Sequence, residues 1–237
     1  MTQFKKTVVI TGAYGGLGSA FCKVYSDNGY NLCLIGKDEN KLKNLKTSLA
    51  TKVLVKTFKC DLSCNEEIVE VCERIKEEFS RIDVVINCAA IFPISSASEM
   101  DLLDFQRCLQ INVTAPFLIT KQFISLMKTT SGGKIINIAS SSAYGGAPNT
   151  SAYCASKHAL LGLSRSWFKE LKQDNIRVYC VSPGSIQTEM GREVEKLGQL
   201  YDTFMTAEEV AQYTFSTTSY EGNMISEEVR LNRVFVQ

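Results

Sequence analysis

Short runs of apolar, β-branched residues alternate with segments of helical length along almost the whole chain. The expected strands cover residues 7–11, 31–35, 52–58, 82–87, 134–139, 176–182 and 228–236. The expected helices cover residues 16–28, 38–49, 65–79, 113–128, 151–172 and 207–217. Nearly continuous apolar strands are typical of a parallel sheet that is buried on both faces. The alternation therefore predicts an α/β fold, a doubly wound and mostly parallel sheet with helices on both faces.

Length and composition exclude several classes of protein. The 237 residues are enough for one domain with a large core, so we expect a single domain over residues 1–237. A formal net charge of +1 gives no field for binding nucleic acid or an anionic membrane, and no apolar stretch approaches the roughly 18–20 residues that span a bilayer. One histidine and nine scattered cysteines predict a reduced, cytoplasmic protein without a metal site.

A glycine-rich turn follows the first expected strand, in the sequence Thr-Gly-Ala-Tyr-Gly-Gly-Leu-Gly from Thr11 to Gly18. A dinucleotide pyrophosphate needs close approach to the backbone and gains from the free N–H groups at a helix start. A glycine-rich loop in isolation is weak evidence, but its place between a strand and a helix strengthens the prediction of a dinucleotide site. The alternative is a glycine-rich turn that binds no ligand.

Tyr153 and Lys157 lie four residues apart in an expected helix and so project from the same face. An unperturbed tyrosine has a pKa near 10, which is poorly suited to proton transfer at neutral pH. A neighbouring ammonium favours the phenolate, so we expect Lys157 to lower the pKa of Tyr153. Such a tyrosine could give a proton to a carbonyl oxygen. On its own, this spacing more often reflects surface packing than catalysis.

Seven motifs occur in the order typical of the short-chain dehydrogenase/reductase superfamily, which the chain resembles over nearly its whole length. The pattern Y-x-A-S-K is met by residues 153–157, and the turn T-G-x-x-x-G-x-G is met by residues 11–18. The other motifs are Asp61 after the third strand, residues 87–90, Asn112, residues 136–140 and the P-G-x-x-x-T loop ending at Thr188. Two depart from the family pattern, since residues 87–90 read Asn-Cys-Ala-Ala and Ser182 replaces an asparagine.

The resemblance implies a Rossmann-like fold and a tyrosine-based hydride-transfer enzyme. It makes Tyr153 the general acid/base, with Lys157 lowering its pKa and binding the nicotinamide ribose. Ser140 would steady the substrate oxygen, and Asn112 would help to hold a proton-relaying water. The implied cofactor-binding residues are Gly12, Tyr14, Gly16, Leu17, Gly18, Lys37, Asp61, Leu62, Asn87, Ala89, Tyr153, Lys157, Pro183, Gly184, Ile186 and Thr188.

The end of the second strand bears on which dinucleotide binds. Enzymes of the family that use NAD usually carry an acid near position 36, where this chain has Gly36. Lys37 could pair with a 2′-phosphate, provided that Asp38 turns outward. Gly15 argues the other way, because many NADP enzymes have a basic residue there. On balance the sequence favours NADP(H) over NAD(H).

Several residues have a second interpretation. Asp61 could serve only the next helix, because Ser63 and Glu66 have the spacing of a capping box. His158 points away from the Tyr153–Lys157 face and is expected to be packed or solvated. Helical spacing of apolar residues within about 188–206 indicates either core packing or a segment that covers the substrate; these are Met190, Val194, Leu197 and Phe204.

The expected function is hydride transfer between a nicotinamide and a ketone or secondary alcohol, in a carbonyl reductase or alcohol dehydrogenase. Two alternatives stay open: a dinucleotide-binding redox sensor without turnover, and a sugar-modifying relative, since Gly15 also fits T-G-x-x-G-x-x-G. The family's usual closing segment is missing, which leaves the substrate and the common tetramer in doubt. We expect a homodimer or homotetramer, and a dimer through residues 113–128 and 151–172 would not need that tail.

Overall fold

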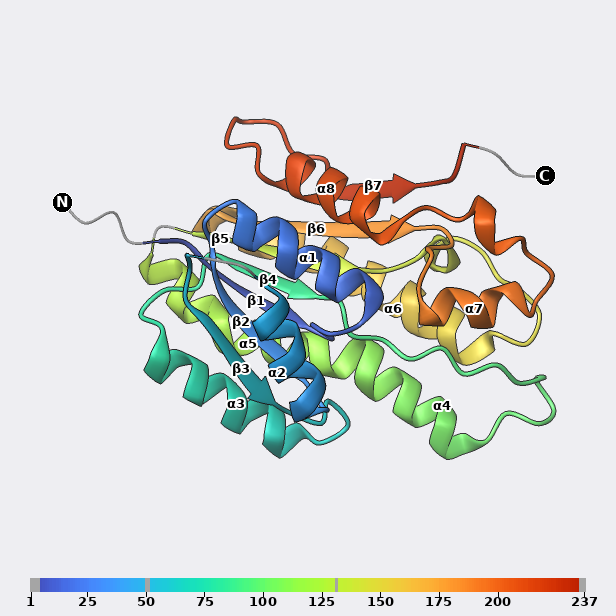
Figure 1. Ribbon diagram of the computed structural model, residues 1–237. Coiled ribbons are helices and arrows are strands. Elements are labelled where there is room, and N and C mark those ends of the chain that lie inside the picture. The colour runs from blue at the N-terminus through green and yellow to red at the C-terminus, as the bar shows by residue number, and fades with distance from the viewer. Residues whose placement is uncertain (1–4, 50–51, 131, 235–237) are drawn as a thin grey trace.

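In the computed structural model, residues 5–49, 52–130 and 132–234 are described, and within them seven parallel strands form one sheet (Figure 1). The strands are β1 (Thr7–Thr11), β2 (Asn31–Gly36), β3 (Val55–Lys59), β4 (Val84–Asn87), β5 (Gly133–Ile138), β6 (Ile176–Pro183) and β7 (Glu228–Leu231). Their order across the sheet is β3-β2-β1-β4-β5-β6-β7. The order reverses between β1 and β4, so a crevice is expected at the carboxyl ends of these two strands.

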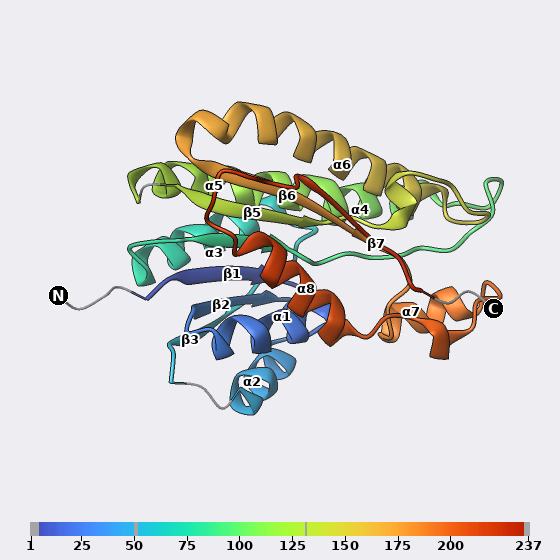
Figure 2. The same cartoon turned by 90° about the horizontal axis from the view of Figure 1, so that it is seen from above.

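Helices cover both faces of the sheet (Figures 1 and 2). One face carries α1 (Gly16–Asp27), α2 (Glu39–Ser48) and α8 (Ala207–Thr218). The other carries α3 (Asn65–Glu78), α4 (Leu102–Leu109), α5 (Ala115–Thr129) and α6 (Ser151–Leu171), while α7 (Glu189–Glu195) lies beyond the carboxyl ends of the strands. The predicted doubly wound parallel fold is confirmed. No helix in the described ranges is long and apolar enough to cross a membrane.

Burial on both faces explains the apolar strands. In β1, Val8 and Ile10 pack against Phe21 of α1, whereas Val9 packs on the opposite face with Ile68 of α3. The side chains of these five residues, three from β1 and one each from α1 and α3, are inaccessible to solvent. Every β1 position therefore favours an apolar or small residue, and the alternation that marks a half-exposed strand is absent.

The largest departure from the expected elements precedes Asn112. The sequence predicts a helix that starts at residue 113, but α4 begins at Leu102 and continues through a π-helical turn, Gln110–Thr114, into α5. Asp101 opens α4 by accepting hydrogen bonds from the backbone N–H groups of Leu103 and Asp104. Leu102 and Leu103 are exposed, so apolar periodicity does not mark the buried face of this helix.

Other boundaries shift by a few residues. β3 starts at Val55 instead of residue 52, β4 at Val84 instead of 82, and β7 ends at Leu231 instead of 236. Residues 235 and 236 of that expected strand lie outside the described residues. The α7 helix was not predicted as a separate element. Gly29, which the sequence places just past the first helix, has the positive φ of 81° that favours glycine there.

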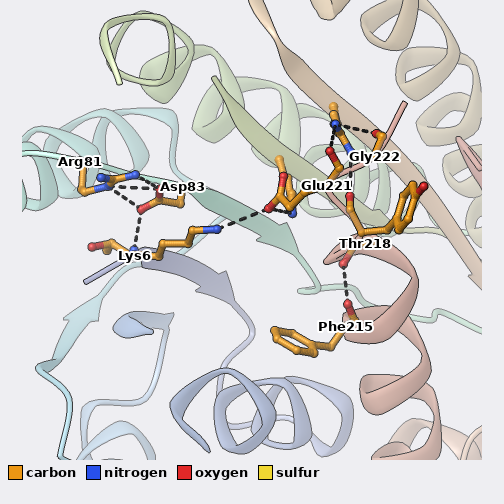
Figure 3. A network of polar contacts seen from close by, with 11 residues as sticks. Lys6, Arg81, Asp83, Phe215, Thr218, Glu221 and Gly222 are labelled. Atoms are coloured by element: carbon orange, nitrogen blue, oxygen red, sulfur yellow. Dashed lines mark hydrogen bonds and ion pairs between the residues drawn. The ribbon is translucent and has the colours of Figure 1, made fainter. Parts of the chain in front are cut away.

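A polar network lies at the amino ends of the strands, on the opposite side of the sheet from their carboxyl ends (Figure 3). Asp83, which is buried, accepts a 2.7 Å hydrogen bond from the backbone N–H of Thr7 and pairs with Arg81 through both carboxylate oxygens. Glu221 accepts from Lys6 at 3.4 Å and from Lys134 at 2.9 Å, which ties the segment after α8 to β1 and β5. These charged residues line a hollow of about 150 Å³, in which Asp83 and Glu221 are each paired with a cation.

Replacing Asp83 with alanine is expected to lower the free energy of unfolding by about 2 kcal/mol, because the buried N–H of Thr7 loses a charged acceptor. For a chain of this size the midpoint of thermal unfolding would fall by roughly 4–8 °C. The control is Lys43→Ala, which removes only an exposed pair with Glu39 and should leave the midpoint unchanged. Equal midpoints for the two variants would contradict the role of Asp83.

Candidate active site

A cavity of about 740 Å³ opens at the carboxyl ends of the strands, where the order of the sheet reverses. The sequence motifs converge on it from separate parts of the chain. The predicted site residues that line it are Gly12, Tyr14, Gly16, Leu17, Gly18, Lys37, Asp61, Leu62, Ala89, Ser140, Tyr153, Lys157, Pro183, Gly184, Ile186 and Thr188. This volume lies in the range that small-molecule sites occupy in proteins.

The glycine-rich turn holds β1 against the end of β4. The Thr11 hydroxyl oxygen accepts hydrogen bonds from the backbone N–H groups of Cys88 at 3.0 Å and Ala89 at 3.1 Å. Gly12 has a φ of 63°, and a Cβ atom there would lie 2.8 Å from the Cα atom of Ala89. Only glycine fits this position without displacing the backbone of the neighbouring strand.

The start of α1 is open towards the cavity. Its N-cap residue is Gly15, which has no side chain to accept from the first-turn N–H groups at Gly16 and Leu17. A Cβ atom on Gly16 would lie 2.6 Å from the Thr188 side chain, so a residue larger than glycine would displace Thr188 from this helix end. Free N–H groups and the helix dipole make this a site for an anionic group such as a pyrophosphate.

Tyr153, Lys157 and Ser140 form a buried group in the cavity wall, exposed by 8%, 2% and 9% respectively. Tyr153 and Lys157 lie one turn apart on α6, while Ser140 follows β5. The Lys157 ammonium donates to the backbone oxygen of Ile138 at 2.8 Å and lies 5.4 Å from the centre of the Tyr153 ring. The helix and the end of β5 thus bring the three residues together.

Burial has the largest effect on the pKa values of Tyr153 and Lys157. Burial raises the pKa of Tyr153 to about 12, against the opposing effect of a hydrogen bond with Ser140. Burial lowers the pKa of Lys157 to about 8. The Lys157 ammonium donates to the backbone oxygen of Ile138, and its predicted effect on the pKa of Tyr153 stays a prediction. At neutral pH the tyrosine is a proton donor.

Asn112 lies behind the cavity wall, in the π-helical turn between α4 and α5. Its amide accepts from the backbone N–H of Ile91 at 2.9 Å and donates to the Ile91 oxygen at 3.0 Å and to Ser156 at 3.0 Å. The side chain therefore joins the segment after β4 to α6, next to Tyr153. Irregular helical turns of this kind are frequent at functional sites.

Asn87 also lies outside the cavity lining, which departs from its predicted contact with the cofactor. Its amide nitrogen donates to Thr120 at 3.0 Å and to Asn137 at 2.8 Å, and Asn137 in turn donates to Ser164. These contacts connect β4, β5, α5 and α6. Asn87 thus supports the wall from behind.

The end of β2 brings a lysine, Lys37, to one corner of the cavity. Tyr14 packs on Gly36, where a Cβ atom would come within 2.5 Å of the Tyr14 ring, so a side chain at position 36 would require this ring to move. Lys37 forms a 2.6 Å ion pair with Asp61. Asp38 turns away to cap α2, accepting from the backbone N–H of Lys41, as a 2′-phosphate site requires.

Asp61 does not act as part of a capping box. The N-cap residue of α3 is Cys64, and Ser63 instead donates through both its backbone N–H and its hydroxyl to Asp61. The predicted capping box is wrong: it requires Ser63 to be the N-cap residue of the helix, whereas the N-cap of α3 is the next residue, Cys64. Partial burial disfavours ionised Asp61, but hydrogen bonds from Lys37 and Ser63 outweigh it and lower its pKa to about 2.

The α7 helix and the segment after it form the far end of the cavity. Met190, Val194 and Leu197 line it, whereas Phe204 is buried and does not. Three of these four apolar residues therefore line the cavity, as in a segment that covers the substrate, and the fourth is packed in the core. His158 is exposed on α6 and its Nδ1 contacts the backbone oxygen of Cys154.

Several residues that line the cavity were not among the predicted site residues, and they include Phe92, Arg107, Glu193 and Gln199. Phe92 packs edge-on against the Tyr153 ring, with ring centres 4.7 Å apart. Glu193 and Gln199 lie within the segment of about 188–206 that was expected to cover the substrate. Phe92 lies in the loop after β4 and Arg107 on α4, and no motif marks either position.

Comparison with known proteins agrees with this geometry. Residues 6–197 match the family model described as short chain dehydrogenase. The chain is 34% identical to a 3-oxoacyl-[acyl-carrier-protein] reductase of Rickettsia typhi, over 78% of this chain and 74% of that protein. It is 32% identical to an uncharacterized oxidoreductase of Thermotoga maritima, over 77% and 72% of the two chains.

Solved structures share the whole fold. An alcohol dehydrogenase from the archaeon Thermococcus sibiricus, complexed with 5-hydroxy-NADP, has a TM-score of 0.89 at 24% identity and covers 99% of both chains. Levodione reductase has a TM-score of 0.86 at 25% identity and covers 97% of this chain and 96% of its own.

The pH dependence of carbonyl reduction is expected to follow Lys157. Its ammonium would stabilise the phenolate that forms as Tyr153 gives up its proton, so kcat/KM should be flat below about pH 8 and fall above it. Residual activity of Lys157→Arg should show no such fall, because a guanidinium stays charged in this range. The measurement is a pH–rate profile of both proteins, and an unchanged fall in the variant would contradict the assignment.

Proposed function

Because the chain belongs to the short-chain dehydrogenase family of oxidoreductases, we propose that it transfers hydride between a nicotinamide dinucleotide and a ketone or secondary alcohol. The observation that carries this proposal is the buried set of Ser140, Tyr153 and Lys157, which faces the same cavity as the open end of α1. One cavity thus combines a proton donor with a site suited to a pyrophosphate.

The dinucleotide would supply or accept the hydride. Its pyrophosphate would lie against the N–H groups at Gly16 and Leu17, and its adenosine end near Lys37 and Asp61. Thr188 and Ile186 would border the nicotinamide end, as the resemblance implies. Two structural features support the fit: Gly12 leaves no room for a side chain, and the start of α1 has no cap.

The protein would work as an acid in reduction. Tyr153 is protonated at neutral pH and would donate its proton to the carbonyl oxygen, leaving a phenolate. Ser140, which forms a hydrogen bond with Tyr153, would also hold the carbonyl oxygen of the substrate in position. The Lys157 ammonium would offset the new negative charge within the buried wall. In the reverse direction the phenolate would remove the alcohol proton, which requires a higher pH.

Carbonyl reduction is the direction that this arrangement favours, since the buried tyrosine holds its proton well above neutral pH. The apolar far end, formed by Met190, Val194 and Leu197, suits an aliphatic or aromatic substituent on the carbonyl. All four positions of the catalytic set are filled, which argues against a sensor without turnover. Cytoplasmic location and assembly as a homodimer or homotetramer stay predictions.

We further propose NADP(H) as the preferred dinucleotide. The Tyr14 ring packs on Gly36 and disfavours an acid there, and Lys37 lies at the corner where a 2′-phosphate would fall. The lysine is held there by its ion pair with Asp61, and a second cation, Lys41, lies over the Tyr14 ring. The positive charge at this corner would favour the phosphorylated ribose.

Tyr153→Phe is expected to bind the dinucleotide as tightly as the parent protein while reducing kcat by about 10²- to 10⁴-fold, the usual contribution of a positioned acid. Binding is measured by nicotinamide fluorescence and turnover by nicotinamide absorbance with a panel of ketones. Tyr213→Phe, which alters an exposed ring on α8, is the control and should keep full activity. Full activity of Tyr153→Phe would overturn the assignment of the acid.

Lys37→Ala is expected to raise KM for NADPH about tenfold, equivalent to 1.4 kcal/mol, with little change for NADH. The reason is the loss of the cation expected beside the 2′-phosphate. Lys43→Ala, on the exposed side of α2, is the control for loss of a surface charge. A parent protein that prefers NADH, or equal losses with both dinucleotides, would contradict the proposed preference.

A further inference from the structure

Gln199, in the segment between α7 and the 3₁₀ turn Tyr201–Thr203, lines the far end of the cavity. Its amide oxygen accepts a 2.9 Å hydrogen bond from the Ser185 hydroxyl, in the loop after β6. The same oxygen accepts a 3.1 Å hydrogen bond from Arg233, in the segment after β7. Two separate parts of the chain therefore hold one atom of this side chain.

Arg233 fixes which way the amide faces. A guanidinium can only donate hydrogen bonds, so the group turned towards Arg233 must be the amide oxygen and not the nitrogen. The –NH₂ group is the other end of the same planar amide, with two donors that are not needed for these contacts. Because Gln199 is a lining residue, its –NH₂ group is the donor that this side chain can offer to a ligand in the cavity.

Arg233 also ties the surrounding segment down. It donates to the Thr203 hydroxyl at 2.7 Å, and its guanidinium carbon lies 5.4 Å from the centre of the Phe204 ring. The segment after β7, where the chain departs from the family's usual ending, thus fastens the cover of the cavity. A donor held at several points loses little conformational entropy when it binds a ligand.

We propose that Gln199 is a specificity residue that donates a hydrogen bond to a second acceptor on the substrate, and that Arg233 is its positioning residue. This inference rests on the proposed carbonyl reduction. The favoured substrate is a ketone that carries a further carbonyl or ester oxygen on the substituent facing α7. Simple hydrocarbon ketones would leave the donor without a partner, at a cost in binding.

The test compares two series of ketones with the parent protein and its variants: ethyl esters of pyruvic, acetoacetic and levulinic acid, and the 2-alkanones of matched length. Gln199→Leu should lower kcat/KM for the best keto ester about tenfold and change that for the alkanones less than twofold. Gln199→Glu, whose carboxylate can still accept from Ser185 and Arg233, should retain the fold of the segment but show the same selective loss.

Arg233→Met should show a smaller selective loss, mainly in KM, because the donor remains but is less firmly held. Thermal unfolding of each variant separates this effect from a general loss of structure. Gln173→Leu, which changes an exposed residue after α6, is the matched control and should behave as the parent.

The outcomes distinguish the two proposals. If the parent protein reduces ketones but Gln199→Leu affects both series equally, the inference about Gln199 is overturned and the proposed function stands. If the parent reduces neither series with either dinucleotide, the proposed function fails and this inference fails with it.

Discussion

The contact between the ends of β1 and β4 determines where this protein can bind a ligand. The Thr11 hydroxyl accepts from two successive N–H groups beyond β4, which brings Gly12 against Ala89. With the two strand ends joined in this way, α1 starts at the floor of the cavity and the segment after β4 forms its side. The reversal of strand order at this point supplies the crevice, and this contact gives it its shape.

Burial sets the proton chemistry of the site. A tyrosine and a lysine that are nearly inaccessible to water both shift towards their neutral forms, so the phenol holds its proton and the ammonium loses its own more readily. The hydrogen bond from Lys157 to the backbone of Ile138 anchors the charge without cancelling it. Asn112 and Asn87 keep this wall in place from behind, through amide contacts that join four elements.

Much of the fold and of the site could be predicted from the sequence, because the signals are local. The glycine turn, the Tyr153–Lys157 spacing and the apolar strands each express a constraint that acts within a few residues. Features that depend on distant contacts could not be predicted. Examples are the π-helical turn at Asn112, the start of α4 at Leu102, and the hydrogen bond between Arg233 and Gln199. The pKa of Tyr153 belongs to the same group, since it depends on how deeply α6 is buried.

The contact between Tyr14 and Gly36 has a consequence for how such a protein can change over evolution. An acid at position 36 would collide with the Tyr14 ring, so that substitution is unfavourable while the tyrosine is present. A smaller residue at position 14 would have to come first, or the two changes would have to arise together. If NADP(H) is preferred as proposed, that preference would depend on two positions that lie 22 residues apart in the chain, and the order of substitutions at these positions would matter.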